Sequence, residues 1–214
     1  MNQANTNIKG MPLCLIIMML SGCAQQSLPR PVTDATERYF GTGYSALPPE
    51  GNDWHFLEQS PNLTVFGKVL PAQRKKLMHT FVATIMVMKP EIQKVNFAAE
   101  FPKAQEELFR AQLTRKGFRL LSLQSVPYGL PGSYCSRYDL EQEERNNPYT
   151  PGLVFNITAH GFVCLDASSE FMIDASYSER RPQGSASALD DKLKREAEGF
   201  LRHIAVTPLR QTKE

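Results

Sequence analysis

The chain has 214 residues, of which 42% are hydrophobic and 21% are charged, an ordinary composition for a globular protein that excludes wholesale disorder. This length is enough for one domain with a real core and is thin for two. The formal net charge of +2 is too close to neutral to attract nucleic acid or anionic lipid over long distances, so no nucleic-acid partner is expected.

The first element is a short apolar run over residues 11–20, which leads into Leu20-Ser21-Gly22-Cys23. As a helix this run would span about 15 Å, roughly half of a bilayer core, so it indicates a cleaved signal segment and not a transmembrane helix. The small residues before Cys23 are typical of a signal-peptidase site. An ordinary secretory signal followed by a chance cysteine is the alternative.

This pattern resembles the lipobox of bacterial lipoproteins. The resemblance implies that residues 1–22 are removed and that Cys23 carries palmitate-type acyl chains, which are enough for stable anchoring to a bilayer. The next residue is Ala24 and not aspartate, which in enterobacterial lipoproteins favours the outer membrane. We therefore expect a lipid-anchored protein of the bacterial cell envelope that faces the periplasm from the outer membrane.

Residues 24–50 contain four prolines and two glycines and show no sustained hydrophobic periodicity. Together with Cys23 they are expected to form a disordered tether over residues 23–50, with an end-to-end distance of roughly 30 Å. The globular domain would then be residues 51–214. Trp54, the single tryptophan, lies at its start and is expected to anchor the core, with stacking on a ligand as the minor alternative.

Alternating apolar residues predict strands at 63–70 and 78–88, which would form a hairpin, and the second is apolar on both sides, as expected for a central strand. Further strands are expected from residue 118 and over 133–141, 153–165 (with a bulge at Gly161) and 171–177. Helical spacing predicts helices at 100–116 and 188–204. The apolar stripe of the first consists of Ala104, Leu108, Ala111 and Phe101, and Phe109 and Leu113 widen it.

This order of elements indicates an α+β fold, in which an antiparallel sheet of about five to six strands carries two main helices packed on it. Over residues 51–206 the order resembles that of the PsbP-like α/β/α sandwich. That resemblance implies a binding or assembly module and not an enzyme. It rests on element order alone, so it assigns no functional residue.

Two cysteines remain besides Cys23 and the discarded Cys14, namely Cys135 and Cys164. Facing residues of an antiparallel hairpin have a constant index sum, and this pair centres the hairpin between Tyr149 and Thr150, between two prolines. The register therefore predicts a cross-strand disulfide, which an oxidising periplasm would preserve and which would stabilise the fold by about 3 kcal/mol. Two buried free thiols are the alternative.

No stretch has a catalytic signature, and neither a metal site nor a cofactor site is expected. The four histidines lack zinc-site spacing. Ser133, His160 and Asp166 have the residue types of a catalytic triad, but any chain of this length contains such a set, so it does not indicate a hydrolase. Glu179-Arg180-Arg181 is expected to be an exposed loop after the last strand, with an anion site as its alternative.

These observations predict a non-catalytic envelope lipoprotein that binds an envelope protein partner or stabilises an assembly. One alternative is a carrier of a small apolar ligand or lipid, held in a cavity between the sheet and the two helices. A less favoured alternative is a hydrolase of envelope polymers, which would need a cleft with convergent acid, base or nucleophile.

Overall fold

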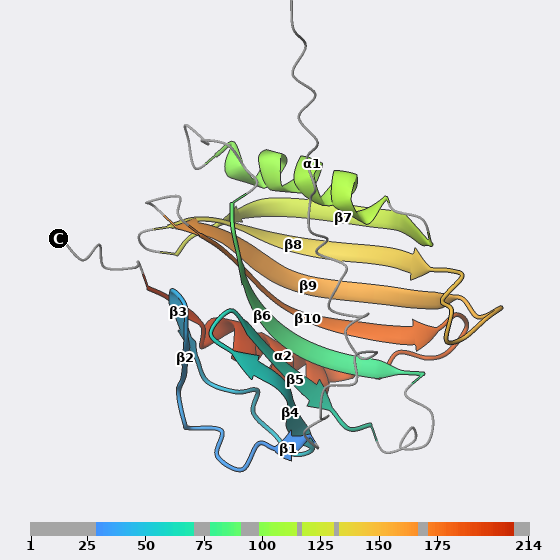
Figure 1. The fold of residues 1–214 in the computed structure, drawn as a ribbon, viewed down its shortest axis with the longest axis horizontal. Helices are drawn as coiled ribbons and strands as arrows, with labels where there is room; N and C mark the ends of the chain where they lie inside the picture. Colours follow the sequence, from blue (N-terminus) through green and yellow to red (C-terminus); the bar gives the residue numbers. More distant parts are fainter. Residues whose placement is uncertain are drawn as a thin grey trace, which may run out of the picture.

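The computed structural model describes residues 29–70, 78–90, 99–114, 117–130, 133–166 and 171–207, so the signal segment and Cys23 lie outside the described residues. The eight strands of the large sheet are β1 (Arg30–Pro31), β4 (Trp54–Ser60), β5 (Leu63–Lys68), β6 (Thr80–Met88), β7 (Phe118–Tyr128), β8 (Ser133–Glu144), β9 (Phe155–Asp166) and β10 (Met172–Pro182). A smaller sheet contains β2 (Tyr39–Gly41), β3 (Tyr44–Ala46) and β11 (Ala205–Val206). The helices are α1 (Phe101–Leu113) and α2 (Asp191–Arg202) (Figure 1).

Every pairing in the two sheets is antiparallel. The large sheet has the order β1-β4-β5-β6-β10-β9-β8-β7, and the small one has the order β11-β3-β2. The fold prediction was therefore wrong, because a five- to six-stranded sheet with two helices packed on it understates the strands and omits the second sheet. It was wrong because four of the described strands (β1, β2, β3 and β11) have only two or three residues, too few to show a period, and because β4 was not recognised as a separate strand.

The predicted disordered tether is also corrected over its described part. Residues 29–50 contain β1, β2 and β3, and Tyr44 and Ala46 are buried in the main core. Proline-rich composition does not prevent this, because β1 is a two-residue edge strand, a position where proline is tolerated.

The two helices lie on opposite faces of the large sheet, as the alternation of β10 shows. Ile173 and Ala175 belong to the cluster packed against Phe200 of α2, whereas Met172 belongs to the cluster packed against Phe109 of α1. We call these the α2 face and the α1 face. The amphipathic prediction for α2 is confirmed, since Leu193, Ala197, Phe200 and Leu201 are buried.

The β8–β9 hairpin has the predicted register, with Cys135 facing Cys164 and Glu144 facing Phe155 at its closed end. Gly161 pairs in step with its neighbours on both sides, so the bulge expected there is absent. Within the described residues, no helix is both long enough and apolar enough to cross a membrane.

Candidate functional site

The candidate site lies where α1 packs on the β7 end of the large sheet. The buried stripe of α1 repeats every fourth residue and consists of Phe101, Gln105, Phe109 and Leu113. Phe101, Phe109 and Leu113 of the predicted stripe are buried, whereas Ala111 is exposed. The side of the helix that is buried also places the amide of Gln105 inside the interface.

A groove of about 350 Å³ runs between α1 and β7. Its helical wall includes Pro102, Lys103, Glu106 and Arg110, and its strand wall includes Ser125 and Pro127. The Arg110 guanidinium pairs with Glu106 at 2.7 Å and donates to the backbone oxygen of Leu123 at 3.3 Å. The groove therefore presents a few small apolar groups together with fixed charges of both signs. Such a surface is suited to contact the side chains of another protein.

Behind the strand wall is a buried amide. Ser125 Oγ and Ser136 Oγ donate to Gln105 Oε1 at 2.7 and 3.3 Å, and Gln105 is fully buried. Within the described part of the chain, Gln105 Nε2 has no hydrogen-bond partner. Because an amide is not a base, it does not activate Ser125, and the arrangement is suited to hydrogen bonding.

β7 is an edge strand, and among the described residues no strand pairs with its second edge. Leu121 and Val126 are 47% and 53% exposed on it. However, the edge is irregular, because the register shifts between Leu120 and Ser122 and because Pro127 has no N–H to donate. Such irregularities oppose the addition of another strand, so this end of the sheet presents its side chains and not its backbone for contact.

A second polar pair is buried on the α1 face. Tyr138 Oη donates to Asp174 Oδ1 at 2.9 Å, although these residues belong to β8 and β10, which flank β9. The hydroxyl reaches that far because Gly161, which has no side chain, faces Tyr138 on β9. Burial, only partly offset by this hydrogen bond, raises the pKa of Asp174 to about 7.

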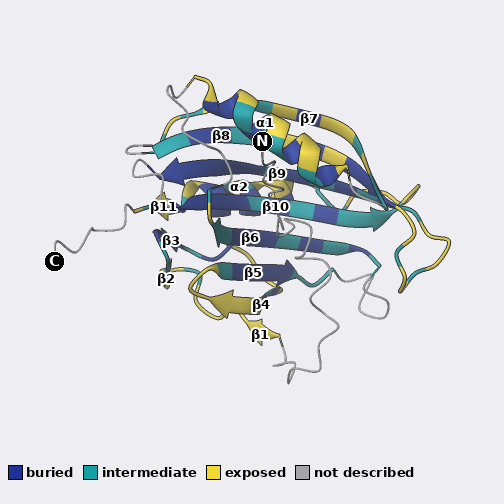
Figure 2. Cartoon of the chain, turned by 45° about the horizontal axis from the view of Figure 1, so that its top comes forward, coloured by how far each residue is buried: buried dark blue, intermediate teal, exposed yellow. Residues whose placement is uncertain are grey.

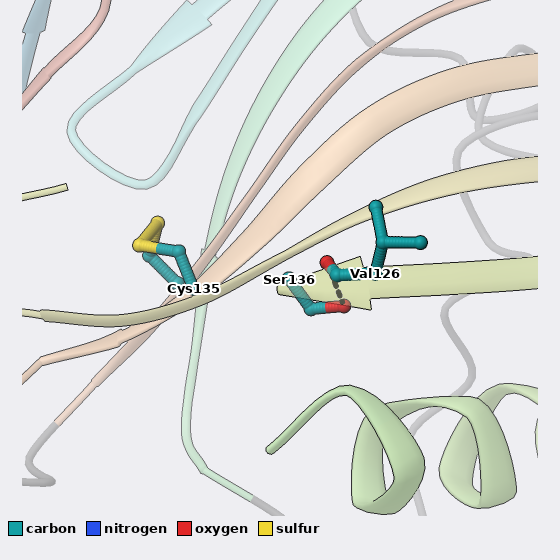
Figure 3. The surroundings of a disulfide bond; sticks show 4 residues. Val126, Cys135 and Ser136 are labelled. Atoms are coloured by element: carbon teal, nitrogen blue, oxygen red, sulfur yellow. Dashed lines mark hydrogen bonds between the residues drawn. A yellow bond between two sulfur atoms is a disulfide. The ribbon is translucent and has the colours of Figure 1, made fainter. Parts of the chain in front are cut away.

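The disulfide between Cys135 and Cys164 is present, as predicted, and lies on the α2 face. The next residue on β8, Ser136, projects to the opposite face, where the backbone oxygen of Val126 at 3.3 Å is a second acceptor within reach of its single hydroxyl proton (Figure 3). The disulfide therefore joins β8 to β9 at the residue next to Ser136, whose hydroxyl lies against β7. Cys23, the predicted lipidation site, lies outside the described residues, and its modification stays a prediction.

The hypothetical triad is not assembled. Ser133 and Asp166 face each other, but His160 is six residues along β9 from Asp166, about 20 Å away. His160 Nδ1 instead pairs with Asp139, and its ring lies 5.1 Å from the ring of Tyr177.

Glu179 was wrongly expected in an exposed loop. It lies in β10, is 1% exposed, and accepts from His79 and Ser187 at 2.6 Å and from Arg181 at 2.8 Å. Its carboxylate also accepts from the backbone N–H of Ala188 at 2.6 Å, so it holds the segment that leads into α2. Burial raises the pKa of Glu179, but these hydrogen bonds outweigh it and the net shift is downward. Trp54 is 1% exposed, which confirms its predicted core role.

The sequence analysis missed Gln105 and Asp174. Asp174 had a usable signal, because it is a lone carboxylate within the apolar run of residues 171–175. Gln105 had a weaker one, its spacing of four from both Phe101 and Phe109.

No protein-family model matches the chain, and no curated protein matches it. Among solved structures, it is similar to the crystal structure of LpqN, involved in cell envelope biogenesis of Mycobacterium tuberculosis. The identity is 17% and the TM-score is 0.44, over 84% of this chain and 90% of that chain. This likeness is too low to transfer the role of LpqN, and neither the PsbP-like family nor the lipobox is shown by it, so both stay predictions.

Proposed function

We propose that this protein is a lipid-anchored, non-catalytic module of the bacterial cell envelope that binds an envelope protein through the α1–β7 groove. The observation that carries the proposal is the groove itself, in which the paired charges of Glu106 and Arg110 lie beside small apolar groups of α1 and of the edge strand β7. The signal segment ending in Cys23 and the disulfide are consistent with an oxidising compartment outside the cytoplasm.

The carrier alternative receives less support. It placed the ligand in one cavity between the sheet and both helices, whereas the helices pack on opposite faces of the sheet. Large aromatic side chains fill the core on each side, including Phe66 and Phe200 on the α2 face and Phe101 and Phe109 on the α1 face.

Photo-crosslinking in intact cells tests the proposal. A photoreactive amino acid replaces Lys103 in the groove, and a matched variant carries it at Lys194, an exposed lysine of α2. We expect one reproducible protein adduct from position 103 and none from position 194. Adducts from 194 alone, or none from either position with the protein strictly monomeric, would overturn the proposal.

A further inference from the structure

The described residues leave little chain between the predicted anchor and the fold. Arg30 already pairs with Phe56 of β4, seven residues after Cys23. Even fully extended, seven residues span only about 25 Å. The sequence alone predicted a disordered tether over residues 23–50. Because residues 30–46 form strands instead, the domain is expected to lie closer to the bilayer.

This attachment also orients the sheet. β1 and β7 are at opposite ends of the eight-stranded order, which at about 4.8 Å per strand places them roughly 34 Å apart. Figure 1 shows β1 and α1 at opposite ends of the molecule. An anchor that enters at β1 therefore holds the β1 end near the lipid and the α1–β7 groove away from it.

An exposed aromatic side chain lies beside that entry point. Phe40 of β2 is 77% exposed, the highest value among the large apolar residues of the described chain. Its neighbour Tyr39 points the other way and packs on Phe56, with ring centroids 4.8 Å apart. The Arg30 guanidinium lies 4.6 Å from the centre of the same Phe56 ring. Tyr39, the residue before Phe40, and Arg30, where the chain enters the fold, thus contact the same Phe56 ring.

We propose that Phe40 and the β2–β3 hairpin contact the surface of the bilayer that holds the acylated Cys23. This inference rests on the lipid anchoring in the proposed function and deepens it by assigning a membrane-facing side. The contact depends on the aromatic ring, because the exposed cations of this end, Arg30 and Arg38, are matched by Asp34 and Glu37. A bilayer surface is favoured as the occupant because the short chain to Cys23 keeps this end beside lipid.

Fluorescence quenching in vesicles tests the contact. The full-length lipidated protein is placed in vesicles of phosphatidylethanolamine and phosphatidylglycerol, with and without bromine on the acyl chains. The variant Phe40→Trp adds a fluorophore at the proposed contact, while the native Trp54 is 1% exposed and provides a constant background. Tyr149→Trp is the matched control, since Tyr149 is 70% exposed in the β8–β9 turn, six strands from β1.

We expect brominated lipid to remove most of the added emission of Phe40→Trp and to leave that of Tyr149→Trp unchanged. If the protein floats with the vesicles through a modified Cys23 but Phe40→Trp is not quenched, the contact is refuted and the anchor stands. Equal quenching at both positions refutes the orientation. If mass spectrometry finds Cys23 unmodified and the protein does not float, the anchoring and the inference fail together.

Discussion

The substitution Asp174→Asn should change how the stability of the fold depends on pH. Asp174 is 8% exposed on the α1 face, and the residues that face it on the two neighbouring strands are Met86 and Val163. In such surroundings the neutral carboxyl is favoured over the carboxylate, which raises the pKa of Asp174 from 3.8 to about 7. Asparagine has nearly the same shape and keeps an oxygen to accept from Tyr138.

The sign and size of the effect follow from the two pKa values. Between about pH 4 and pH 7 the folded chain holds a proton that the unfolded chain releases, so the free energy of unfolding falls as the pH rises through this range. The full loss is about 4 kcal/mol, of which about 2 to 3 kcal/mol falls between pH 5 and pH 8. The Asn variant carries no such proton and should lack this part of the slope.

Urea unfolding of both proteins at several pH values between 5 and 8 measures this difference. Glu141→Gln is the control, since Glu141 is an exposed residue of β8 and should leave the slope unchanged. We expect Asp174→Asn to gain stability relative to the wild type as the pH rises. If the two proteins lose stability in parallel over the whole range, Asp174 is ionised in the fold at neutral pH and the reasoning is wrong.

Three other substitutions test the contacts around the candidate site and the core. Tyr138→Phe removes the donor to Asp174 and should cost about 1–3 kcal/mol in urea unfolding, with a larger loss at pH 8 than at pH 5, because the hydroxyl stabilises the carboxylate; an equal loss at both pH values would contradict this. Replacing Cys135 and Cys164 together by alanine should lower the free energy of unfolding by about 3 kcal/mol, and the wild type in reductant should match the variant. Glu196→Ala leaves the Trp54 indole N–H and the Lys68 ammonium without the carboxylate that they contact at 3.0 and 2.6 Å. We expect the free energy of unfolding to fall by about 3 kcal/mol, and to fall less in Glu196→Gln, which keeps an oxygen to accept from Trp54.

The parts of the fold that the sequence predicts well are a helix with a long, regular apolar stripe and a hairpin whose register follows from residue numbers. The β8–β9 hairpin follows from the positions of two cysteines and two prolines, because an antiparallel register is set once its turn is located. α2 follows from an apolar stripe of six residues. Its start was predicted at residue 188, three residues too early, because the helix is capped by Asp190, whose side chain accepts from the N–H of Leu193 at 2.7 Å.

The parts that it does not predict depend on contacts between distant segments. β2 and β3 are three-residue strands, and nothing local distinguishes them from a loop; Tyr44 is buried because its hydroxyl bonds to Thr64 of β5 at 2.8 Å and its ring joins the α2-face core. The side of α1 that is buried likewise depends on Tyr138 of β8, whose ring lies 5.0 Å from that of Phe109. Periodicity does not show such partners, so it correctly included Phe101, Phe109 and Leu113 but also included the exposed Ala111 and missed Gln105.

The two ends of the large sheet are exposed and differ from each other, a property that neither the composition nor the net charge predicts. Exposed residues concentrate at β1 and β4 at one end and along β7 at the other, while the strands between them are largely buried (Figure 2). The disulfide joins β8 to β9 at Cys135, and the residue facing Cys135 across the β7–β8 ladder is Tyr128, whose ring stacks 5.3 Å from Phe162 of β9. β7, the strand wall of the groove, is therefore held by its ladder to β8 and by the packing of Tyr128 on β9, while the disulfide joins β8 and β9 covalently. The proposed function requires this kind of stiffness, because a partner bound at the α1–β7 groove would be coupled to an anchor at β1 through the strands of the sheet.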